Sequence, residues 1–119
     1  MRPKSLAFIG DAQRAAGLIQ QSVTGHVLAD YLRDPLLKSA VERQFEIIGE
    51  ALNGLSHTDP DVAVGVPHLP RIVAFRNVLT HGYAVIDDEI VGEAATTKVS
   101  GLVETLDGLL NDVAGSGHG

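Results

Sequence analysis

The chain has 119 residues, which is enough for one domain, and 45% of them are hydrophobic but only 4% aromatic. A core built mainly from Leu, Ile, Val and Ala favours packed helices, and the absence of cysteine excludes disulfides, thiolate metal sites and a cysteine nucleophile. The formal charge of −6 argues against broad nucleic-acid coating through a basic surface, yet it leaves room for a small local cationic site.

No apolar run of the sequence is long enough to cross a bilayer. The basic start and short apolar run at the N-terminus resemble a signal peptide, but Asp11, Gln13 and Arg14 interrupt the apolar core that such a peptide needs. We therefore expect a cytoplasmic protein that does not enter a membrane.

A first helix is predicted from about residue 5 to residue 23. One face of this segment carries apolar residues at helical spacing, namely Ile9, Ala12, Ala16, Ile19 and Val23. Gly25 breaks the pattern, and residues 26–34 are expected to form a short helix or turn.

A long helix is expected from Pro35 to Ser56, because Asp34 and Pro35 are a favourable N-cap and first helical residue. Its apolar stripe consists of Leu37, Val41, Phe45, Ile48, Leu52 and Leu55. A weaker stripe (Ala40, Gln44, Ile47 and Ala51) lies beside it, and Glu42, Glu46 and Glu50 form the third face. Gly49 indicates either close approach by another backbone or simple tolerance of a glycine.

The Pro- and Gly-containing stretch 57–69 is expected to be a loop. A third helix should begin at Pro70, bury Ile72, Phe75 and Leu79, and end near Gly82. Asp87, Asp88 and Glu89 favour a last helix that continues to about residue 113. The sequence thus predicts one all-α domain, residues 1–113, folded as an antiparallel bundle of four to five helices. Residues 114–119 are expected to be a disordered tail.

Four polar residues stand close together at the end of the third predicted helix, in the stretch RNVLTHGY: Arg76, Asn77, His81 and Tyr83. A guanidinium matches phosphate oxygens, and an imidazole readily carries a proton near neutral pH. The sequence has neither a Gly-rich phosphate loop nor an acidic metal cluster, so we expect phosphate chemistry without a metal or cofactor.

Two blocks of the sequence, AVERQFEIIGEALNGLS and FRNVLTHGYAVIDDEIV, together resemble the HepT-like proteins of the HEPN superfamily. That resemblance implies a helical, homodimeric endoribonuclease, encoded as the toxin of a type II/VII-like pair beside a minimal nucleotidyltransferase antitoxin. The family signature, Arg followed by four to six residues and His and continued to Tyr, maps to Arg76, His81 and Tyr83. The segment PRIVAF departs from relatives that often carry tryptophan there.

The resemblance also implies roles for the motif residues in cleaving RNA by attack of the ribose 2′-OH. His81 would transfer a proton, Arg76 would stabilise charge on the phosphorus oxygens, and Asn77 would orient His81 or a phosphate oxygen. Tyr83 would be the hydroxyl that the antitoxin modifies with a nucleotide (AMPylation), and Glu50 and Arg43 are candidate supporting residues.

The spacing limits how Arg76 and His81 can act together. Residues five apart on a regular helix point about 140° apart, whereas Asn77 and His81, four apart, share a face. Either the last turn loosens before Gly82, or two copies of the motif meet across a dimer.

Other interpretations of these residues stay open. Arg76 could pair with Glu46 or Glu50, His81 could bind the last helix carbonyls, Tyr83 could cover the end of the bundle, and Arg43 could belong to a solvated face. The protein could then be a catalytically silent partner or modification target of a nucleotidyltransferase, or a nucleotide-binding helical module. The remaining histidines are expected at the surface: His26, His57, His68 and His118.

Overall fold

The computed structural model describes residues 2–81 and 87–116, except for the side chains of residue 81 and residues 113–116. Its longer helices are α1 (Pro3–Val23), α3 (Pro35–Thr58), α5 (Leu69–His81) and α7 (Val99–Ser116). Shorter elements connect them: α2 (Leu28–Arg33), α4 (Pro60–Ala63), α6 (Asp88–Glu93) and the π-helical segment η1 (Ala94–Lys98). No strand occurs within the described ranges, so the prediction of an all-α fold is confirmed.

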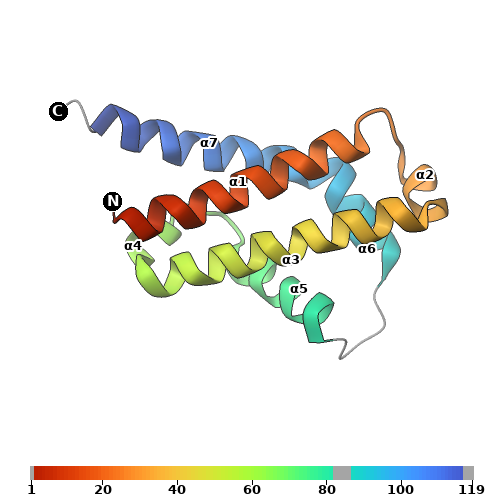
Figure 1. Ribbon diagram of the computed structural model, residues 1–119, viewed down its shortest axis with the longest axis horizontal. Helices are drawn as coiled ribbons and strands as arrows, with labels where there is room; N and C mark the ends of the chain where they lie inside the picture. Colours follow the sequence, from red (N-terminus) through yellow and green to blue (C-terminus); the bar gives the residue numbers. More distant parts are fainter. Residues whose placement is uncertain (1, 82–86, 117–119) are drawn as a thin grey trace.

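The three longest helices form an antiparallel layer (Figure 1). α1 runs opposite to both α3 and α7 and packs against each of them, and α5 packs against α3. The molecule measures 50 × 31 × 19 Å. Since a helix with its side chains is about 10 Å across, the thinnest dimension corresponds to two helices. This flattened bundle leaves α5 supported mainly by α3.

Local capping explains where two of the helices begin. The Asp34 carboxylate accepts hydrogen bonds from the backbone N–H groups of Leu36 and Leu37, both at 3.1 Å, and Pro35 is the first helical residue of α3. Asp87 caps α6 in the same way. Gly25 takes a positive φ of 80° and allows the chain to turn after α1. These three predicted boundaries are confirmed.

The predicted apolar stripes form the core between α1 and α3. All the residues expected on the face of α1 are buried, as is the stripe of α3 apart from the half-buried Leu37. The weaker stripe is only partly covered, because Ala51 is buried but Ala40 is exposed. In α5, Leu79 is buried while Ile72 and Phe75 are half-buried. The face of α5 is therefore less completely covered than predicted.

Three predicted segments differ from the observed structure or extend beyond it. The expected loop 57–69 contains α4, and the expected last helix is divided into α6, η1 and α7. Thr96 and Thr97 donate hydroxyl hydrogen bonds to the carbonyls of Gly92 and Glu93, at 2.9 and 2.6 Å, and such bonds bend helices. Residues 114–116, expected in the tail, continue α7, whereas residues 117–119 and the predicted helix end at Gly82 lie outside the described residues.

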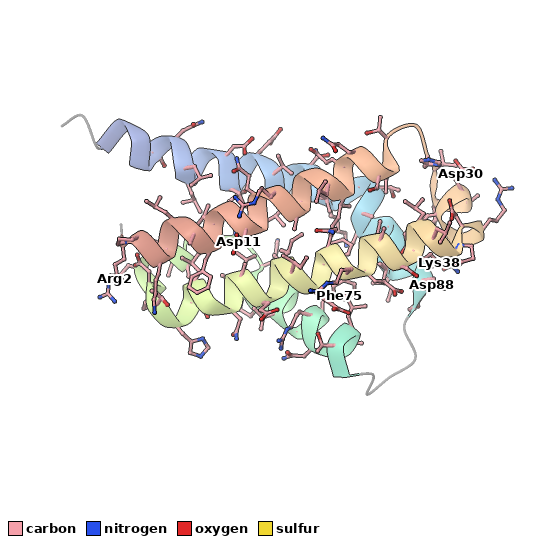
Figure 2. All side chains as sticks on the ribbon, viewed as in Figure 1. Arg2, Asp11, Asp30, Lys38, Phe75 and Asp88 are labelled. Atoms are coloured by element: carbon pink, nitrogen blue, oxygen red, sulfur yellow. The ribbon has the colours of Figure 1, made fainter. Side chains whose placement is uncertain are left out.

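An ion pair joins the start of α3 to α6 (Figure 2). Lys38 Nζ lies 3.2 Å from Asp88 Oδ2, and both side chains are partly shielded from solvent. Gly92 of α6 packs closely against Tyr31 of α2, because a β-carbon there would lie 2.5 Å from the ring. These contacts fix the position of α6.

Candidate active site

Helix α5 carries the polar motif and takes its position from α3. The chain enters α5 through His68, which has a positive φ of 63°, and the His68 carbonyl accepts the hydrogen bond of the Arg71 N–H at 3.0 Å. Phe75 packs edge-to-face on Phe45 of α3, with ring centroids 5.3 Å apart and an interplanar angle of 84°. This aromatic pair secures the middle of α5.

Helices α3 and α5 approach each other closely at Gly49 and Arg76. A β-carbon added to Gly49 would lie 2.1 Å from Arg76 Cβ and 2.7 Å from Arg76 Cγ, far inside van der Waals contact. Gly49 is buried and Arg76 is half-buried. The prediction of close approach by another backbone is confirmed, since Arg76 Cα would lie 3.4 Å from the added β-carbon, and the alternative of simple tolerance is wrong. Only glycine lets the stem of Arg76 rest on α3.

The Arg76 guanidinium has no carboxylate partner among the described residues. Its Nη1 donates a hydrogen bond to Asn77 Oδ1 at 2.9 Å. The alternative ion pairs with Glu46 or Glu50 are not formed: Glu46 instead accepts from Arg43 Nη1 at 3.2 Å. An arginine held at its stem and free of acidic partners can direct its remaining N–H groups to a phosphate.

The two candidate supporting residues occupy different positions on α3. Arg43 is exposed and engaged with Glu46, three residues further along the same helix. Glu50 is exposed and follows Gly49 directly. Because it is adjacent to Gly49, Glu50 lies near the point where α3 and α5 cross. The only hydrogen bond described for the Arg76 side chain goes to Asn77, not to Glu50.

His81 is the last residue of α5, and its side chain lies outside the described part of the structure, as does all of Tyr83. The backbone nevertheless limits how the motif is used. α5 stays α-helical through His81. Positions five apart on a regular helix differ by about 140° in direction. The last turn up to His81 therefore shows no loosening that would align the two within one chain.

The other tyrosine of the chain is a core residue. Tyr31 is fully buried, and its hydroxyl has no hydrogen-bond partner within the described residues. Burial raises the pKa of the Tyr31 hydroxyl, and the nearby carboxylates of Glu42 and Asp88 raise it further. Tyr31 is thus inaccessible to a modifying enzyme in the folded protein.

Residues 2–81 and 87–116 contain no group of three or more His, Asp or Glu side chains placed to share a metal ion. The helices within the same ranges include none with the length and apolar character required to span a bilayer.

Sequence reasoning identified Gly49 and Arg76 separately but missed that they touch each other. The signal available was their presence in the two blocks that carry the family resemblance, together with the cost of a mid-helix glycine. It also missed the Phe45–Phe75 pair, whose members lie in the same two blocks.

Comparison with known proteins assigns this architecture to a family. The family model described as "Ribonuclease HepT-like" matches residues 12–109, which include both sides of the α3–α5 crossing. A protein of Methanocaldococcus jannaschii that is provisionally named an RNase is 28% identical over 88 residues, covering 72% of this chain and 70% of that protein. No solved structure gives a significant match. The chain therefore belongs to the ribonuclease HepT-like family.

Proposed function

We propose that the protein is a metal-independent endoribonuclease that cleaves RNA at a site built from Arg76, Asn77 and His81. The observation that carries this proposal is the position of Arg76: its stem is packed on Gly49, its guanidinium has no described acidic partner, and it lies within the part of the chain that matches a ribonuclease family. An arginine so placed suits an anionic substrate.

The proposed reaction is an internal transesterification of RNA. The ribose 2′-oxygen bonds to the adjacent phosphorus and loses its proton to a base, while the bond from phosphorus to the 5′-oxygen breaks and that oxygen gains a proton. The products are a 2′,3′-cyclic phosphate and a free 5′-hydroxyl. His81 carries the proton, and Arg76 binds the phosphorus oxygens as their charge rises. Asn77 orients the Arg76 guanidinium by accepting its hydrogen bond.

The catalytic unit is proposed to be a symmetric homodimer. Positions five apart on a regular helix differ by about 140°. We therefore expect one phosphate to be contacted by Arg76 of one copy and His81 of the other. Two-fold dimers are the commonest closed assemblies, and their interface uses the same surface patch of both copies. An interface that includes α5 would thus bring the two motif helices together.

The biological setting is proposed to be a cytoplasmic toxin–antitoxin pair in which a cognate minimal nucleotidyltransferase neutralises this toxin. The proposed point of control is the Tyr83 hydroxyl, two residues beyond His81. A bulky anionic nucleotide attached there would obstruct RNA binding, and its phosphate would bind Arg76 in place of the RNA phosphate. Of the two tyrosines in the sequence, Tyr31 is excluded as the target by its burial.

Cleavage of RNA by purified protein, with and without EDTA, tests the proposal. Wild type should cut an RNA oligonucleotide and leave a 2′,3′-cyclic phosphate, and an oligonucleotide carrying 2′-deoxyribose at the cut position should resist. Arg76→Ala and His81→Ala should each abolish cleavage while helical circular dichroism is unchanged. Arg33→Ala is the matched control, since Arg33 is an exposed arginine of α2 engaged with Asp30. Equal cleavage by all four proteins would refute the assignment.

A second candidate function is a catalytically silent partner or modification target of a nucleotidyltransferase. The net charge of −6 favours it, because an acidic chain attracts RNA less than a basic one does. Under this alternative, wild type would bind or be modified by the transferase without cutting RNA, and Arg76→Ala would not alter that association.

A further inference from the structure

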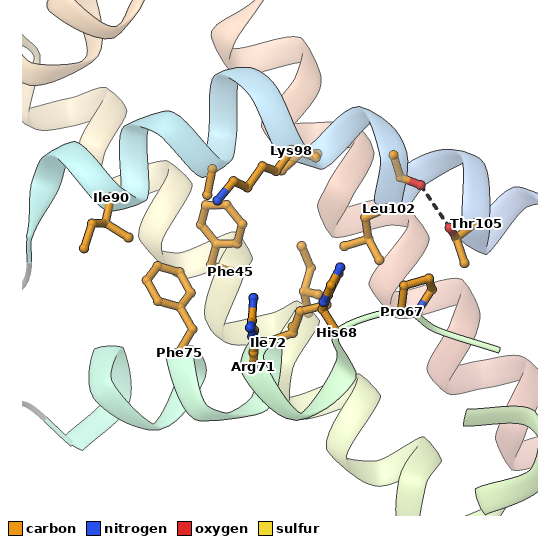
Figure 3. Close-up of a pocket in the computed structure, with 14 residues that line it drawn as sticks. Phe45, Pro67, His68, Arg71, Ile72, Phe75, Ile90, Lys98, Leu102 and Thr105 are labelled. Atoms are coloured by element: carbon orange, nitrogen blue, oxygen red, sulfur yellow. Dashed lines mark hydrogen bonds between the residues drawn. The ribbon is translucent and has the colours of Figure 1, made fainter. Parts of the chain in front are cut away.

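A groove separate from the motif residues lies between α5 and the segment from α6 to α7 (Figure 3). Its lining is largely apolar and includes Phe45 and Ile48 of α3, Ile72 of α5 and Leu102 of α7. The volume is about 680 Å³, within the range of small-molecule sites. Because α5 packs mainly on α3, the space beside it is left unfilled. Arg76, Asn77 and His81 are not among its lining residues.

The charge at the rim of this groove is opposite in sign to that of the chain as a whole. His68 and Arg71 point from the α5 side toward the helix that carries Lys98, which borders the other side. None of the lining residues is acidic, although the sequence has 15 acidic residues against 9 Lys and Arg. Within the described residues neither Arg71 nor Lys98 forms an ion pair. The rim is therefore complementary to an anion.

Two irregularities of the backbone meet at the same groove. His68 is the only described residue other than glycine with a positive φ, and Lys98 ends the π-helical segment η1. Both conformations are uncommon, and both occur preferentially at functional sites. His68 also precedes the first turn of α5, where the helix dipole favours negative charge. The irregularities place two of the three polar rim residues, His68 and Lys98.

From this geometry we propose that the groove binds a small organic anion with an apolar body, its acidic head between Arg71, Lys98 and His68 and its body on Phe45 and Ile72. The half-buried Phe75, on the edge of Phe45, completes the apolar surface. The proposal is independent of RNA cleavage, since it uses none of the proposed catalytic residues.

Decanoate serves as the probe, and decyltrimethylammonium, with the same chain length and the opposite charge, serves as its control. Calorimetric titration of the full chain below micellar concentrations should show decanoate binding and much weaker binding of the cation. Arg71→Gln and Lys98→Gln should each weaken decanoate binding about threefold, as expected for exposed charge pairs, and the double variant about tenfold. Arg33→Gln removes an exposed charge from α2 and should leave binding unchanged.

Three results would overturn the proposal. The first is no decanoate binding by wild type, and the second is equal binding of the two probes. The third is decanoate binding that the double variant retains in full while its circular dichroism matches wild type. Each would show that the rim cations do not select an anion.

Discussion

Replacing Gly49 with alanine probes the contact that positions Arg76. The new β-carbon would lie 2.1 Å from Arg76 Cβ, whereas carbon atoms in contact are about 3.5–4.0 Å apart. Since backbone and stem atoms face each other here, no flexible side-chain end can move aside. α5 must therefore retreat from α3 by about 1.5 Å at Arg76.

The expected effect is small on stability and large on catalysis. Overpacking of this kind lowers the free energy of unfolding by about 1–3 kcal/mol. Replacing a mid-helix glycine by alanine raises it by about 1 kcal/mol, because alanine has the higher helix propensity. Gly49→Ala should therefore lower the free energy of unfolding by no more than about 2 kcal/mol. A misplacement of about 1 Å in a catalytic group can cost about 100-fold in rate, so kcat for RNA cleavage should fall by about that factor.

Gly54→Ala is the control, because it places a new β-carbon on the same helix against α1, away from Arg76. A β-carbon at Gly54 would lie 2.5 Å from the Phe8 ring of α1. Denaturant unfolding and single-turnover cleavage should be measured for both variants. Gly54→Ala should keep its kcat when corrected for the folded fraction. A folded Gly49→Ala protein with wild-type kcat would refute the view that α3 positions Arg76.

Three further predictions concern other parts of the chain. Tyr83→Phe should resist nucleotide transfer by the cognate transferase, seen as unchanged intact mass, whereas Tyr31→Phe should still gain the nucleotide; modification lost only in Tyr31→Phe would contradict this. Burial and the charges of neighbouring carboxylates raise the pKa of Glu42 in the folded protein. The folded state therefore binds the Glu42 proton more tightly than the unfolded state does, and the free energy of unfolding falls as rising pH ionises this carboxyl. Glu42→Gln should accordingly be more stable than wild type at pH 7, with the difference in melting temperature vanishing near pH 4; a constant difference would argue against it. Asp34→Ala should lower the free energy of unfolding by about 1 kcal/mol in urea titrations through loss of the α3 cap, and an unchanged value would show that the cap adds nothing.

The sequence was sufficient for most of the fold because the governing signals are local. The stripe of α3 and the caps at Asp34 and Asp87 depend on residues within a few positions of one another, and the structure confirms them. The division of the last helix was missed, because it depends on Thr96 and Thr97 competing for backbone carbonyls within a segment whose apolar spacing is continuous.

The candidate site was predictable in composition but not in geometry. Arg76, Asn77 and His81 stand out by residue type and spacing, whereas the contact of Arg76 with Gly49 joins residues 27 positions apart and depends on how α5 crosses α3. The groove beside α5 was also beyond prediction, since it exists because α5 packs mainly on α3 and leaves Ile72 and Phe75 half-buried. Both features are tertiary, and no single helical pattern encodes them.

Complementation between two inactive variants tests the central claim most directly. Arg76→Ala and His81→Ala proteins are purified, confirmed to be inactive alone, mixed in equal amounts, unfolded and refolded together, and assayed for RNA cleavage. Random pairing makes half of the dimers mixed, and each mixed dimer holds one site with both Arg76 and His81, so about a quarter of wild-type activity should return. A mixture that exchanges subunits, as shown by native mass spectrometry, and yet stays inactive would contradict a shared site.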